Sequence, residues 1–129
     1  MRNPPRCCVI LCSLLLILCL IGCSTGTPFS QLTLERAVVQ RMSTQGSAQF
    51  TDEDTLRRIE TLLARLKPGR ACDTPPEDPT LMLVLYDKSG DVHTLLTYGA
   101  YLEIDGSAYH AEKETCLSLN TMLWQLLYP

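Results

Sequence analysis

Apolar residues recur at helical spacing in two stretches of the chain. The stripe in the first stretch consists of Leu56, Ile59, Leu63 and Leu66. It predicts an amphipathic helix over about residues 52–66, since positions three and four apart share one helix face. Thr51 is expected to cap this helix together with Asp54, and Pro68-Gly69 is expected to end it.

The second stretch has a stripe made of Leu119, Met122, Leu123 and Leu126. The spacing predicts another helix over about residues 115–127, with Thr115 or Ser118 as its cap.

Residues of about 80–111 follow strand patterns. Leu81–Tyr86 is a continuous apolar run, which is typical of a central strand buried on both faces. Val92–Tyr98 alternates, so that residues 92, 94, 96 and 98 share one face of a strand. Asp105-Gly106 favours a tight hairpin turn, because both positions accept positive φ angles. The pattern predicts an antiparallel meander of four strands.

The segment Gln31–Met42 fits two descriptions. Leu34, Val38 and Met42 have helical spacing, while the Ala37-Val38-Val39 run suits a strand equally well. Gly46 favours a turn, so a strand hairpin is the preferred interpretation. Residues 70–79 hold three prolines and are expected to form a loop.

These elements predict an α+β fold, with an antiparallel sheet of four to six strands covered on one face by two helices. Strand-rich and helix-rich stretches are segregated in the sequence, and β-α-β units are not repeated. This arrangement favours the α+β class over the α/β class. The single domain is expected to span residues 31–129.

The N-terminal region has the pattern of an export signal. Arg2 and Arg6 precede the 13-residue, largely apolar segment Val9–Ile21, which is too short to span a bilayer. Leu20-Ile21-Gly22-Cys23 then resembles the lipobox of bacterial lipoproteins. The resemblance covers residues 1–23 only, and the rest of the chain resembles no specific family.

The lipoprotein resemblance implies that the chain is cleaved and anchored to a membrane. Residues 1–22 would be a signal peptide that is removed, and Cys23 would carry a diacylglyceryl group. Residues 23–30 would form a lipidated tether to the outer face of the cytoplasmic membrane or, in a two-membrane cell, to the outer membrane. Two acyl chains suffice for stable anchoring.

Charge limits the partners. After removal of the signal peptide, nine basic and 14 acidic residues remain, a formal charge of −5. This balance argues against nucleic acid and against anionic lipid as electrostatic partners. The membrane partner would therefore be held through the lipid on Cys23.

Cys72 and Cys116 are the two other cysteines of the processed chain. In an oxidising compartment they have one possible pairing, so we expect a disulfide between them. This disulfide would join residues 44 positions apart and would stabilise the fold by roughly 4 kcal/mol in the chain-entropy model. A catalytic thiol is the alternative.

Catalytic and metal signals are weak. His93 and His110 are the only histidines, and no His or Cys spacing typical of a metal site accompanies them. Ser107 follows a hairpin turn and lacks the motif of a nucleophile elbow. No cofactor motif is present, so neither a metal, a cofactor nor an enzymatic activity is expected.

Tyr98, Tyr101 and Tyr109 all fall on the meander and are the candidate binding surface. Tyrosine is frequent at recognition surfaces, although strand packing alone also accounts for it. The leading hypothesis is a non-catalytic, lipid-anchored envelope protein that binds a protein, peptide or envelope component. The alternatives are a small envelope hydrolase or thiol-dependent enzyme, and a structural subunit of an envelope complex.

Overall fold

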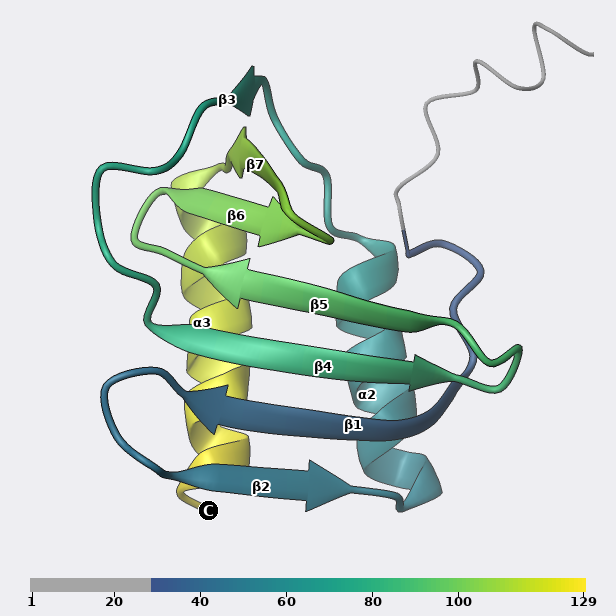
Figure 1. Cartoon of the computed structure of the whole chain (residues 1–129). Coiled ribbons are helices and arrows are strands. Elements are labelled where there is room, and N and C mark those ends of the chain that lie inside the picture. The colour runs from purple at the N-terminus through teal and green to yellow at the C-terminus, as the bar shows by residue number, and fades with distance from the viewer. Residues whose placement is uncertain (1–28) are drawn as a thin grey trace, which may run out of the picture.

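The structure, a computed structural model, describes residues 29–129. It shows a seven-stranded antiparallel sheet with two helices packed against one of its faces (Figure 1). The α+β class is confirmed, and the sheet has seven strands where four to six were expected. The signal peptide and the lipidation site Cys23 lie outside the described residues.

The strands are β1 (Leu34–Arg41), β2 (Ser47–Phe50), β3 (Ala71–Cys72), β4 (Leu81–Asp87), β5 (Val92–Thr97), β6 (Tyr101–Ile104) and β7 (Ser107–His110). The helices are α2 (Glu53–Ala64) and α3 (Lys113–Leu127). The strand order across the sheet is β2-β1-β4-β5-β6-β7-β3.

The hairpin and the meander are confirmed. β1 and β2 pair antiparallel, so the ambiguous segment is strand and not helix. Strands β4 to β7 pair in succession, and the turn between β6 and β7 has positive φ at Asp105 (49°) and Gly106 (87°). The expected loop at 70–79 contributes β3, a two-residue strand that pairs with β7 at the edge of the sheet.

The helix caps differ from those expected. Asp52, and not Thr51, caps α2, because its carboxylate accepts a hydrogen bond from the Thr55 backbone N–H at 3.0 Å. Hydrogen bonding to Thr55, first through its side chain and then through its backbone N–H, lowers the pKa of Asp52. α3 begins at Lys113, two residues before the expected start, and its N-cap Glu112 makes no side-chain cap bond.

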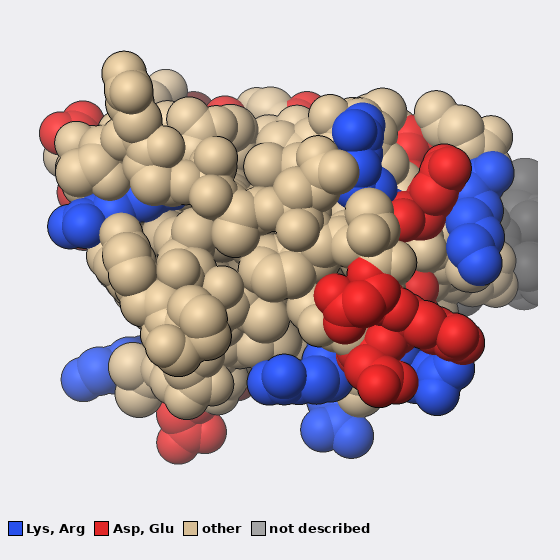
Figure 2. Space-filling model, turned by 90° about the horizontal axis from the view of Figure 1, so that it is seen from below, with Lys and Arg blue, Asp and Glu red and all other residues tan. Residues whose placement is uncertain are grey.

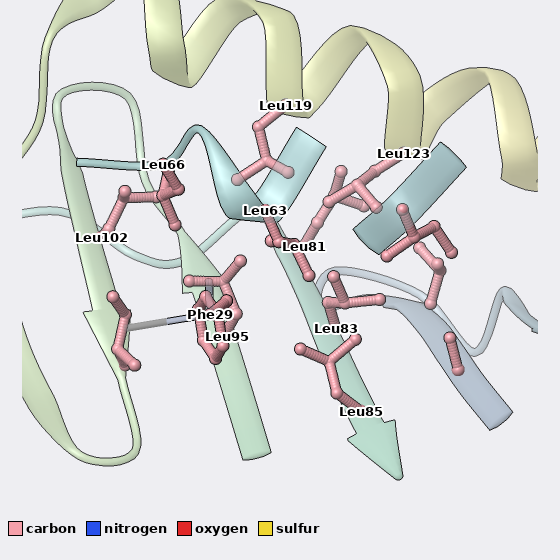
Figure 3. Close-up of a cluster of buried hydrophobic side chains, with 14 of the residues drawn as sticks. Phe29, Leu63, Leu66, Leu81, Leu83, Leu85, Leu95, Leu102, Leu119 and Leu123 are labelled. Atoms are coloured by element: carbon pink, nitrogen blue, oxygen red, sulfur yellow. The ribbon is translucent and has the colours of Figure 1, made fainter. Parts of the chain in front are cut away.

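The core lies between the helices and the sheet (Figure 3). Most of its buried side chains are leucine, and α2 and α3 direct theirs onto alternate residues of β1, β4, β5 and β6. Phe29 belongs to this cluster and is 2% exposed. The domain therefore includes Phe29, which the sequence had placed in the tether.

Strand β4 is central, as expected, but only one of its faces is fully buried. Leu81, Leu83 and Leu85 are inaccessible on the helix side, whereas Met82 and Val84 are partly exposed. The expectation of burial on both faces is therefore wrong. Within residues 29–129, no helix has the length and apolar content needed to cross a bilayer.

Candidate functional site: the open face of the sheet

The face of the sheet that points away from α2 and α3 is covered by no helix in the described part of the chain (Figure 1). We call it the open face and define it by its apolar side chains. These are Val38, Met82, Val84, Tyr86, Val92 and Leu96.

Strand register places these side chains next to one another. Val38 lies opposite Val84 across β1 and β4, and Met82 lies opposite Leu96 across β4 and β5. Directly opposed side chains on one sheet face are in contact distance. The open face thus has a continuous apolar centre, which accounts for the unbroken apolar sequence of β4.

One end of the open face carries a cation–aromatic pair. The Arg36 guanidinium lies 3.8 Å from the centre of the Tyr86 ring, and Val92 opposite Tyr86 is 55% exposed. A guanidinium over a tyrosine ring is held by the ring quadrupole. Arginine and tyrosine are also the residue types that contribute most energy at protein interfaces.

The three tyrosines proposed from the sequence do not form one surface. Tyr98 is only 5% exposed, and its hydroxyl donates a hydrogen bond to Glu103 Oε2 at 2.9 Å. Burial, aided by Glu103, raises the pKa of Tyr98 to about 12. Its inclusion in a contact surface is therefore wrong, because its ring and hydroxyl are already engaged within the domain.

Tyr101 and Tyr109 point to opposite faces of the sheet. Tyr109 lies opposite the fully buried Leu102 and packs against the core. Tyr101 lies opposite His110, and the two ring centres are 5.0 Å apart. Tyr101 is thus the one member of the predicted set that remains available to a contact surface.

The predicted disulfide is not present, since Cys72 and Cys116 are both free thiols. Cys72 lies opposite Ala108, which lies opposite Glu103 on the side of the open face. Cys116 is buried in the core from α3 on the other side of the sheet, and this burial raises the pKa of its thiol. The sheet therefore separates the two sulfur atoms.

The two histidines take separate positions. His93 Nδ1 lies 2.8 Å from Asp105 Oδ2, while Asp105 Oδ1 accepts from the Thr94 N–H at 2.8 Å. A carboxylate orients catalytic histidines in this way, but here it also fastens the β6–β7 turn to β5. Among residues 29–129, no hydroxyl or thiol is hydrogen-bonded to His93, and no cluster suited to a metal ion occurs. Ser107 and His110 do not join this pair.

Comparison with known proteins adds no assignment. No protein-family model matches the chain, and neither a curated protein nor a solved structure shows significant similarity to it. The proposals that follow therefore rest on the residues and the geometry of this chain.

Sequence reasoning missed the open face itself. The signal was present in the apolar residues of β4, which exceed what one covered face requires. It was interpreted as burial on both sides because a continuous apolar run is usually found in such strands.

Proposed function

We propose that the chain is a lipid-anchored, non-catalytic cell-envelope protein that binds a protein partner through the open face. The observation that supports this function best is the uncovered apolar centre of the sheet, with the Arg36–Tyr86 pair at one end. Apolar surface rimmed by polar groups is typical of interaction sites. A broad sheet face suits a protein better than a small molecule, which usually binds in a concave pocket.

The anchor in this proposal is the lipid on Cys23. It rests on the Leu20-Ile21-Gly22-Cys23 sequence and on the preceding apolar segment. Replacement of Cys23 by serine should abolish labelling by a fatty-acid analogue and should leave unprocessed precursor. Continued labelling of Cys23→Ser would exclude this anchor.

The binding surface is tested by site-specific photo-crosslinking of the full chain in its native envelope. A photoreactive amino acid at Val92 probes the open face, and the same group at Tyr128 probes the C-terminal end of α3. The two positions are a matched pair, since both side chains are 55% exposed. We expect a discrete crosslinked protein from Val92, with a reduced yield in the Tyr101→Ala background.

If crosslinking from Val92 is equal with and without the Tyr101 side chain, Tyr101 does not contribute to binding. The binding surface is then confined to strands β4 and β5. An absence of any discrete product from Val92 would contradict binding through the open face. The thermal midpoint of each variant provides the control for folding.

A further inference from the structure

A groove runs between the outer sides of α2 and α3, on the side of the molecule opposite the open face. Its volume is about 850 Å³. Its wall on α2 extends from Asp54 to Arg65, and its wall on α3 extends from Leu117 to Gln125. At 1.5 Å per residue the α2 wall is about 17 Å long, which corresponds to roughly three helical turns.

The groove has an apolar lining. Leu62 of α2 and Met122 of α3 are partly exposed, and Leu117 is 63% exposed. These side chains follow helical spacing but do not belong to the fully buried stripes that cover the sheet. They give the two helices a second apolar contact area, directed outward.

Arginine dominates the charge of the groove. Arg57, Arg58 and Arg65 line it, against one acidic residue, Asp54. Arg57 pairs with Glu53 Oε1 at 2.7 Å, while neither Arg58 nor Arg65 forms a salt bridge with any residue of the described chain. In the view from below, acidic and basic side chains gather together on the α2 side, beside a largely uncharged stretch (Figure 2).

This basic lining contrasts with the rest of the domain. Residues 29–129 contain nine basic and 14 acidic residues, a formal charge of −5. The three groove arginines are thus one third of all basic residues in this part of the chain. An acidic partner is repelled by the domain as a whole and attracted at this groove, so the charge pattern selects one docking position.

We propose that the groove binds an acidic, amphipathic helix of a protein partner. The apolar stripe of that helix would cover Leu62, Leu117 and Met122, and carboxylates beside the stripe would pair with Arg58 and Arg65. An amphipathic helix in an apolar groove is a recurrent mode of peptide recognition, and arginine–carboxylate pairs add direction to it. This inference goes beyond the proposed function, because the groove and the open face lie on opposite sides of the domain.

Two other possible occupants of the groove would bring further positive charges close to its arginines. A second copy docked by the same surface would place Arg58 and Arg65 close to their own counterparts, since a two-fold interface is self-complementary. The chain's own leader contains Arg2 and Arg6 and no acidic residue, so it would also bring like charges together. An acidic segment of another protein is the occupant that complements the groove.

The test is a selection on the full chain, purified in detergent micelles. A display library of helix-forming peptides of about 14 residues, a little over three turns, varies the polar positions among Asp, Glu, Lys, Gln and Ser. We expect enriched peptides to carry Asp or Glu on both sides of an apolar stripe. The charge-reversed variant Arg58→Glu/Arg65→Glu should weaken their binding by about tenfold or more, since like charges then oppose the carboxylates.

The matched control is Lys67→Glu/Arg70→Glu, which changes net charge equally at exposed positions outside the groove lining. It should leave affinity within about twofold, because neither side chain lines the groove and solvent and salt screen exposed charges. Enrichment of peptides without acidic residues, no enrichment at all, or equal weakening by both double variants would overturn the proposal. Binding of anionic vesicles that depends on Arg58 and Arg65, in place of peptide binding, would also overturn it. None of these results alters crosslinking from Val92, so the proposed function is judged separately.

Discussion

Replacement of Leu63 by alanine should destabilise the domain strongly. Leu63 is 0% exposed and lies on the face of α2 that meets the sheet, in one buried cluster with Leu81 and Leu119 (Figure 3). The substitution removes three buried carbon atoms, which at about 0.8 kcal/mol each corresponds to roughly 2.4 kcal/mol of lost transfer free energy. The cavity left behind adds to this cost, so the expected decrease in unfolding free energy is about 3 kcal/mol.

The single tryptophan, Trp124, provides the assay, because its fluorescence reports the packing of α3. With a urea dependence of about 1.5 kcal/mol per molar, a loss of about 3 kcal/mol lowers the urea midpoint by about 2 M. Leu117→Ala is the matched control, since it removes the same atoms from a side chain that is 63% exposed. A Leu63→Ala midpoint shifted no more than that of Leu117→Ala would refute the conclusion that this face of α2 covers the core.

Three further predictions concern buried polar groups and thiols. Thr97→Val should raise the unfolding free energy by about 1 kcal/mol, because Thr97 Oγ1 is buried without a hydrogen-bond partner in the described chain; an unchanged or lower urea midpoint would contradict this. A maleimide should label the partly exposed Cys72 in the folded protein and Cys116 only after unfolding, and intact mass of a non-reduced sample would reveal a disulfide if this is wrong. Stability should fall between about pH 10 and pH 12, because folded Tyr98, with a pKa of about 12, keeps a proton that the unfolded chain, with an ordinary pKa of 10.0, has lost. In Tyr98→Phe, the urea midpoint should depend less on pH in this range. If the urea midpoint of both proteins decreases equally at alkaline pH, groups other than Tyr98 cause the decrease.

Local patterns predicted most of the fold. Period-two alternation and the Asp105-Gly106 pair located the meander, since strand register and tight turns depend on neighbouring residues. Strand β3 escaped prediction because it has two residues and exists only through pairing with β7, 36 or more positions along the chain. No local pattern records such a distant partner.

The candidate site was harder to predict, because it depends on what lies above each face of the sheet. Alternation correctly placed Leu96 and His93 on opposite faces, but it does not state which face the helices cover. The Cys72–Cys116 pairing was inferred by counting thiols, and a count carries no information on the sheet between them. No local pattern indicates that Arg58 and Arg65 line a groove, since the neighbouring helix α3 is distant in sequence.

The burial of Phe29 sets the reach of the domain from its proposed anchor. Phe29 lies six positions after Cys23, and an extended chain covers at most about 3.3–3.6 Å per residue, so Phe29 stays within about 20 Å of the lipid-bearing residue. A protein held in this way searches for partners within a thin layer along the membrane and not throughout the compartment. Confinement to that layer raises the effective concentration of any partner that lies in it. Even a weak interface on such a domain is then occupied, provided that its partner extends to the same layer.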